Sequence, residues 1–262
     1  MTDAPRVPVF LLVLAFAGSS CVGTEAERPA VFGGEGAVVE TPAEQPLPAA
    51  SAPAPSGPCA AARPPGDVAL LDDFEDNDNK VFKAFQREGW WFSATDPTAG
   101  ATLVPAGEFR PEALPESEAK PDNRYAAHLA ASGQKEWGAT WGSTLRWVDQ
   151  GVRCPYNASA FSGIKFRAKG QGTIRLVLGQ PATMPSESGG VCTEKCYDTH
   201  GKVIFLTDKW EEYVVPWDRV QQEGWGTDAR FDPARLIQVG FKVDIKHLPV
   251  DFWLDDVEFV TK

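Results

Sequence analysis

Long apolar runs, basic clusters and histidines are all scarce in this chain of 262 residues. The apolar segment at 7–17 is too short to cross a bilayer as a helix, which takes about 20 apolar residues. Lys and Arg are scattered among a larger number of carboxylates, and the net charge is −11, so no basic patch is present to neutralise the phosphates of a nucleic acid. Helical periodicity of useful length is also missing, which argues against an α-helical fold.

Motifs typical of catalysis are missing too. The chain has no Gly-x-Ser-x-Gly elbow, no His-Glu-x-x-His pair and no phosphate-binding loop, and its three histidines are isolated. A glycosidase needs only two carboxylates at a suitable separation, and acidic residues are plentiful, so that class stays open. We predict a protein that is not an enzyme, with a glycan hydrolase or lyase as the less favoured alternative.

The N-terminal residues have the pattern of an export signal. A short apolar core is followed by small residues up to Cys21, with Gly18 where a bacterial lipobox usually has Leu. We predict a lipoprotein signal peptide at 1–20 and lipidation of Cys21, while an ordinary cleaved signal or an uncleaved anchor remains the alternative. The protein would be exported and held at the bacterial cell envelope, at the outer membrane or cell surface, with the lipid as its only membrane contact.

Large apolar residues are nearly absent between 24 and 65, where Ala, Pro, Glu, Gly and Ser dominate. Such a composition cannot bury enough surface to offset the entropy of ordering, and Pro-rich segments tend to be extended. We therefore predict a disordered Pro/Ala-rich tether at 21–66. The folded domain is expected at 67–262, which holds all nine Trp.

The cysteines beyond Cys21 number four, and an even number in an exported chain favours disulfides. Cys192 and Cys196 are separated by only three residues, so a local bond is the economical pairing, and Cys59 is then left for Cys154. Zinc or free thiols are the alternatives, although only one pair is close in sequence.

Period-two alternation, broken by Gly, Pro and Asp, predicts short strands in eight places. These segments are 68–74, 124–131, 163–169, 173–178, 202–206, 211–216, 237–243 and 251–259. The alternation and the intervening turns indicate an antiparallel sandwich in which each sheet has one solvated face. A short helical turn is expected at 231–236, with Asp232 as the N-cap before Pro233.

Several motifs occur in an order that resembles a known superfamily. They are Leu70-Leu-Asp-Asp-Phe-Glu-Asp, Gly89-Trp-Trp-Phe, Tyr156-Asn-Ala-Ser-Ala-Phe-Ser-Gly-Ile-Lys-Phe-Arg-Ala-Lys-Gly, Trp210-Glu-Glu-Tyr-Val-Val-Pro-Trp and Phe252-Trp-Leu-Asp-Asp-Val-Glu-Phe. The series resembles the galactose-binding-like jelly rolls, and among them carbohydrate-binding modules of family eleven and the complex I intermediate-associated domain. The resemblance covers residues 68–260 and implies an all-β, two-sheet antiparallel jelly-roll β-sandwich.

In the resembling modules, a structural calcium ion joins the first and last strands. The matching carboxylates in this chain are Glu75 and Asp255, together with Asp73 and Asp256. Calcium takes roughly six to eight oxygen ligands, so carboxylates from two adjacent strands suit it. The resemblance thus implies a calcium ion that stabilises the fold and takes no part in catalysis.

A sugar site needs exposed aromatic rings, on which C–H faces stack, beside polar side chains that bind the hydroxyls. Strand alternation offers six candidates for ligand binding: Trp90, Trp137, Trp141, Arg175, Asp198 and His200. With the resemblance, they predict non-catalytic binding of a polysaccharide or oligosaccharide. A protein-interaction scaffold is the alternative, in which Trp137, Trp141 and 198–200 would lie on a flat or apolar surface.

Overall fold

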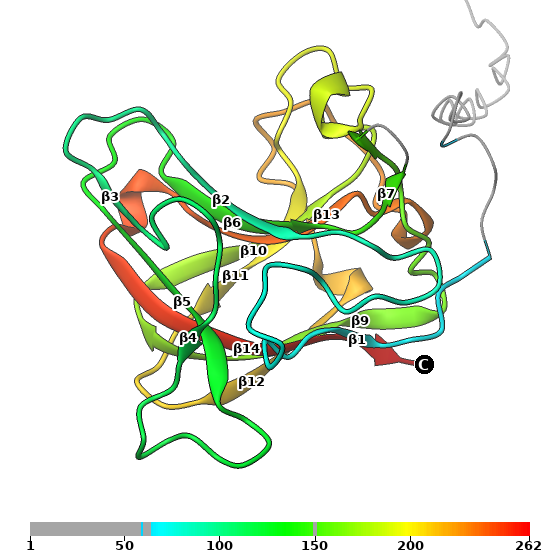
Figure 1. Cartoon of the computed structure of the whole chain (residues 1–262). Helices are drawn as coiled ribbons and strands as arrows, with labels where there is room; N and C mark the ends of the chain where they lie inside the picture. Colours follow the sequence, from blue (N-terminus) through cyan, green and yellow to red (C-terminus); the bar gives the residue numbers. More distant parts are fainter. Residues whose placement is uncertain (1–58, 60–63, 149–150) are drawn as a thin grey trace, which may run out of the picture. The chain divides into compact units, whose positions relative to one another are not determined.

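The computed structural model describes residue 59 and residues 64–148 and 151–262. These residues form two antiparallel sheets, together with a short hairpin of β7 (Trp147–Val148) and β8 (Val152–Arg153) (Figure 1). The larger sheet has seven strands in the order β12-β9-β14-β5-β3, with β1 beside β14 and β4 beside β5. Its strands are β1 (Leu70–Asp72), β3 (Thr102–Val104), β4 (Glu112–Ala113), β5 (Tyr125–Ser132), β9 (Phe161–Gln171), β12 (Glu211–Pro216) and β14 (Val250–Thr261).

The smaller sheet has five strands in the order β11-β10-β13-β6-β2. They are β2 (Trp91–Thr95), β6 (Ala139–Thr144), β10 (Thr173–Gly179), β11 (His200–Phe205) and β13 (Gln238–Val243). The chain changes sheet between β9 and β10, between β11 and β12, and between β13 and β14. This alternation confirms the predicted two-sheet jelly-roll sandwich, and each of the eight predicted segments overlaps an observed strand.

Apolar side chains at alternate positions of both sheets fill the space between them. Trp91 and Trp141 of the smaller sheet and Phe252 and Phe259 of the larger one are almost completely buried in one cluster. The predicted helical turn is also present, because Asp232 accepts a hydrogen bond of 2.9 Å from the N–H of Ala234 at the start of a 3-10 turn.

Both predicted disulfides are present, Cys59–Cys154 and Cys192–Cys196. The N–H of Gly66 donates to the carbonyl of Asn157 at 2.9 Å, and the first of the disulfides joins residue 59 to the loop before β9. Within the described part of the chain, no helix has the length and apolar character needed to span a membrane. The predicted signal peptide, Cys21 and the tether up to residue 58 lie outside the described residues.

Candidate functional site

The three predicted aromatic ligands lie in three different environments. Trp90 is half-buried, and its ring lies 4.1 Å from that of Trp147 between centroids. Trp137 is 40% exposed, but Trp141 is completely buried and donates its indole N–H to the carbonyl of Val104 at 2.8 Å. The prediction of Trp141 as an exposed ligand-binding residue is therefore wrong, since its ring lies in the core. The physical reason for the error is Gly138, whose φ of 97° turns the backbone just before β6 begins and so breaks the strand alternation between 137 and 141.

Arg175 points away from the core, as its alternation with Ile174 predicts, but it is only 8% exposed. Its guanidinium donates to the carbonyl of Gln221, which lies in a segment that pairs with Gly201 at the edge of β11. Most of this side chain is thus used within the fold, and only a small part of it remains for a ligand.

Asp198 and His200, expected to bind ligand from one side, are both buried. The carboxylate of Asp198 accepts the backbone N–H groups of 223, 224 and 226 at 2.8–2.9 Å, which fixes that loop. His200 pairs with Leu178 of β10 and shares its core-facing side, where burial lowers the pKa of the imidazole. Both assignments as exposed ligand-binding residues are therefore corrected: Asp198 anchors a loop and His200 is a core residue.

A row of glycines crosses the outer side of the five-stranded sheet, the side that faces away from the other sheet. Because directly paired residues of neighbouring strands point to the same side, the register defines this row. It runs Phe92, Gly142, Gly240, Val177 and Gly201 across the five strands. The next row runs Ala94, Thr140, Lys242, Arg175 and Val203. We call the surface made by these two rows, together with Gln238, the glycine face.

Two side chains lie across the glycines at its centre. A Cβ added to Gly142 would come within 2.9 Å of Phe92 Cζ and 2.8 Å of Gln238 Nε2, and one on Gly240 would come within 3.3 Å of the same nitrogen. Residues without side chains are therefore what lets the ring and the amide lie low over the sheet. Phe92 and Thr140 are half-buried, and Lys242 forms an ion pair of 2.6 Å with Asp244.

The glycine face combines an aromatic ring, an amide, a hydroxyl and an ammonium group over a floor with few side chains. Phe92, Thr140, Gln238 and Lys242 were missing from the sequence-based candidates. Phe92 could have been found, because it lies two residues after Trp90 and alternation puts both on one side of the strand. Gln238 and Lys242 could not, because only the register of β13 against β6 brings them beside Phe92.

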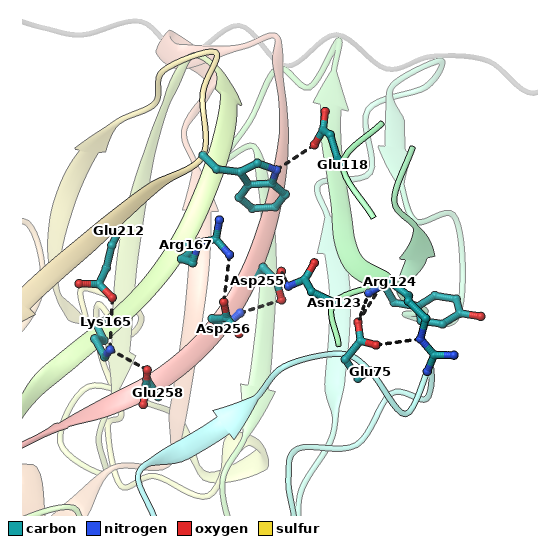
Figure 2. A network of polar contacts seen from close by, with 12 residues as sticks. Glu75, Glu118, Asn123, Arg124, Lys165, Arg167, Glu212, Asp255, Asp256 and Glu258 are labelled. Atoms are coloured by element: carbon teal, nitrogen blue, oxygen red, sulfur yellow. Dashed lines mark hydrogen bonds and ion pairs between the residues drawn. The ribbon is translucent and has the colours of Figure 1, made fainter. Parts of the chain in front are cut away.

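The outer side of the seven-stranded sheet is organised differently. Lys169 forms an ion pair with Glu118 and lies over the rings of both Trp210 and Trp253. Three further ion pairs lie on this surface: Arg167 with Asp256 at 3.3 Å, and Lys165 with Glu258 at 2.7 Å and with Glu212 at 3.2 Å (Figure 2). His128 is stacked on Trp253. We call this surface, made by Lys165, Arg167, Lys169, Trp210, Trp253 and His128, the charged face.

The four carboxylates proposed for calcium do not come together as one set. Asp256 is ion-paired with Arg167, and Asp73 accepts the backbone N–H of Glu75 at 3.3 Å (Figure 2 shows the first of these). No three residues of the types His, Cys, Asp and Glu are grouped for metal binding in the part of the chain that the structure describes. The carboxyl groups of Asp73 and Asp256 thus have other partners in the fold, and the four-residue ligand set stays a prediction.

Glu75 and Asp255 do fit part of a calcium site. Glu75 accepts hydrogen bonds from the backbone N–H groups of Arg124 and Tyr125 at 2.6 and 2.8 Å (Figure 2). Asp255 accepts one of 2.7 Å from the side-chain amide of Asn123, the residue just before Arg124. Asp255 is 1% exposed, and burial raises its pKa to about 7. A buried carboxylate suits a hard cation, so a calcium ion held by Glu75 and Asp255 remains a prediction.

Neither the scan of protein-family models nor the search of curated proteins gave a match. Among solved structures, a family 11 carbohydrate-binding module of a cellulosomal cellulase of Clostridium thermocellum is similar, with 14% identity and a TM-score of 0.48 over 75% of this chain and 95% of that one. A family 11 module from the same organism in complex with a β-1,3-1,4-mixed-linked tetrasaccharide has 15% identity and a TM-score of 0.45, over 76% and 98%.

A family 30 module of another cellulosomal cellulase of Clostridium thermocellum has 16% identity and a TM-score of 0.41, over 71% of this chain and 98% of that one. The similar structures thus include carbohydrate-binding modules of the family that the motif series resembles. At these identities they transfer no ligand and no residue role to this chain.

Proposed function

We propose that this protein binds carbohydrate without catalysis and that the glycine face is its binding surface. The observation that carries the proposal is the row of glycines that lets the ring of Phe92 and the amide of Gln238 lie side by side on a flat sheet. A pyranose ring has C–H groups that stack on an aromatic ring and hydroxyls that pair with an amide in both directions. The glycine face offers these two partners together.

The part of the glycine face over β2, β6 and β13 holds its partly exposed aromatic and polar side chains. Phe92, Thr140 and Lys242 keep part of their surface exposed there, whereas Arg175 and Val177 of β10 are 8% and 6% exposed. Gln238 is also only 8% exposed, so we place the sugar over the ring of Phe92, with Thr140 and the Lys242–Asp244 pair beside it and the amide of Gln238 beneath. Trp137 is 40% exposed just before β6.

The cellular setting belongs to the same proposal. Two disulfides are typical of exported proteins, and a small binding domain on a lipid anchor would hold a glycan close to the membrane. The lipid anchor on Cys21 is a sequence-based prediction. Incorporation of radiolabelled palmitate tests it, and we expect the label in the wild-type chain but not in Cys21→Ser.

Affinity electrophoresis of the full chain in native gels that contain glucan, xylan or a cell-wall glycan tests the binding itself. We expect retardation by at least one neutral polysaccharide, with a loss of affinity of about tenfold or more in Phe92→Ala, since aromatic anchors dominate binding energy. Phe85→Ala is the matched control, because Phe85 is 59% exposed and lies outside the glycine face. Normal migration of the wild type in every gel would contradict the proposal.

The scaffold alternative loses its specific support. It required Trp137, Trp141 and residues 198–200 to form one flat or apolar surface, but Trp141, Asp198 and His200 are buried at 0%, 2% and 5% exposure. A surface made of those residues does not exist in the described fold.

A further inference from the structure

The loop that joins β4 to β5 carries one carboxylate onto the charged face (Figure 1). Every residue of 115–122 is exposed except Glu118, which is half-buried. The carboxylate of Glu118 accepts the indole N–H of Trp210 at 2.8 Å (Figure 2) and forms an ion pair with Lys169. Within the described fold, Glu118 is the residue of 115–122 whose side chain has a hydrogen bond or an ion pair with another element. The polar contacts between this segment and the sheet therefore depend on one acidic group.

The two ends of the loop are fixed without Glu118. Leu114 is 7% exposed and donates its N–H to the carbonyl of Arg124 at 2.8 Å. Asn123 donates its side-chain amide to Asp255 at 2.7 Å. Because these contacts hold the base of the loop, the tip at 115–122 can leave the charged face while β4 and β5 stay in place.

The charged face holds Glu118 as a binding site holds a carboxylate. Hydrogen bonds from the ammonium group of Lys169 and the indole of Trp210 keep the pKa of the Glu118 carboxyl below its usual range, so the ionised form is favoured. Glu118 is the acidic partner of Lys169 among the described residues. A carboxylate from a ligand finds the same two donors once Glu118 has moved away.

Two aromatic rings lie close to these donors. The ammonium group of Lys169 is 5.4 Å from the ring centroid of Trp210 and 5.8 Å from that of Trp253, and both residues are half-buried. A carboxylate bound to Lys169 therefore brings the group that carries it near indole rings, on which the C–H groups of a pyranose stack. Carboxylate donors beside indole rings suit a uronic acid, which has both a carboxylate and a sugar ring.

We propose that Lys169, Trp210 and Trp253 form a second binding site, for uronate-containing glycans, which Glu118 occupies until such a ligand displaces it. The carboxylate of the uronate takes over the hydrogen bonds from Lys169 and Trp210, and the tip of the loop moves into solvent. While Glu118 is in place, the site is closed to neutral glycans, because they have no carboxylate to replace it. This site is independent of neutral-glycan binding on the glycine face, so either function can exist without the other.

The test is calorimetric titration of the full chain with trimers of D-galacturonate and of D-glucuronate. Maltotriose and triglutamate are the comparison probes, because the first lacks carboxylates and the second lacks sugar rings. Removing the internal competitor raises the fraction of the protein that is free to bind, so Glu118→Ala should bind at least one uronate trimer about tenfold or more tighter than the wild type. Glu118→Gln keeps the length of the side chain without its charge, so its affinity should rise too. Lys169→Met added to Glu118→Ala should abolish the gain.

Glu116→Ala is the matched control, because Glu116 is exposed in the same loop and its loss changes the net charge equally. It should bind the uronate trimers as weakly as the wild type does, and Phe92→Ala should do the same while losing neutral polysaccharide. Uronate affinity that rises in neither Glu118→Ala nor Glu118→Gln would overturn the proposal and mean that Glu118 only fixes the loop. Triglutamate or maltotriose bound by Glu118→Ala as tightly as the uronates would overturn it as well, and the triglutamate result would indicate a site for acidic peptides.

Discussion

The two outer faces of the sandwich come from the same strand alternation and yet have opposite character. On the charged face, each cation has an acidic partner, and Trp210 and Trp253 are covered by Lys169 or stacked on His128. On the glycine face, small residues at the centre leave the ring of Phe92 and the amide of Gln238 over a bare sheet.

The difference shows that aromatic content alone does not locate a binding surface. Trp210 and Trp253 are the larger rings, but their faces are occupied by neighbouring side chains. Phe92 is smaller, and its neighbours across the strands are glycines. A ligand competes with internal partners on the first surface and with water alone on the second, so we expect the charged face to stabilise the fold and the glycine face to bind.

The largest expected effect comes from filling the glycine face. Gly142→Val places a branched side chain where Phe92 and Gln238 now lie, so retardation by polysaccharide should disappear in affinity electrophoresis. Ala130→Val makes a similar addition on the larger sheet, where Ala130 points away from the core between Leu129 and Ala131, and should leave binding unchanged. If Gly142→Val binds normally, the two faces do not differ in the proposed way.

A change in pH tests whether the contact between the two sheets can be weakened without a change in glycan binding at the glycine face. Asp72 of β1 accepts the indole N–H of Trp91 in the smaller sheet at 2.6 Å, and burial raises its pKa to about 8 from an ordinary value of 3.8. Because the folded state holds this proton more tightly than the unfolded chain, its stabilising contribution is complete below pH 4. It is lost as pH rises through about 8.

Urea unfolding at pH 5, 7 and 9 measures this effect. The wild type should lose stability with rising pH by a few kcal/mol more than Asp72→Asn does, since one pKa unit corresponds to about 1.4 kcal/mol. Glycan affinity of the folded protein should stay constant over the same range. Parallel pH profiles for the two proteins would show that Asp72 does not titrate in this way.

Removing one member of the charged face should cost stability and leave binding alone. Lys169→Met leaves Glu118 without its cation and uncovers two indole rings, so we expect a loss of about 1–2 kcal/mol in the free energy of unfolding. Lys202→Met is the control, because Lys202 is exposed on β11. A double-mutant cycle with Glu118→Gln isolates the pair, and reduced glycan affinity in Lys169→Met would mean that this face also binds.

The sequence predicted local periodicity better than contacts between distant residues. Alternation placed eight strands and the outward direction of Arg175, because it depends only on near neighbours along the chain. Alternation failed for Trp141, because the turn at Gly138 interrupts the strand before it. It also failed for His200, because the side of the sheet on which this side chain lies depends on the pairing with Leu178. The Lys169–Glu118 pair joins residues 51 positions apart, and no local pattern indicates it.

The smallest expected effect concerns calcium, which would act beside β14, a central strand of the larger sheet. An extracellular site that binds in the range of about 0.1–1 mM raises stability by about 1 kcal/mol at millimolar calcium. We expect the unfolding midpoint to rise with calcium relative to EDTA in the wild type and in Asp256→Asn, because Asp256 is paired with Arg167. Asp255→Asn should abolish the shift, since that buried carboxylate contacts Asn123, next to the segment that Glu75 binds. Equal midpoints in EDTA and in calcium would show that no calcium ion stabilises the fold. The buried Asp255 would then be stabilised by its hydrogen bonds from Asn123 and from the backbone N–H of Asp256.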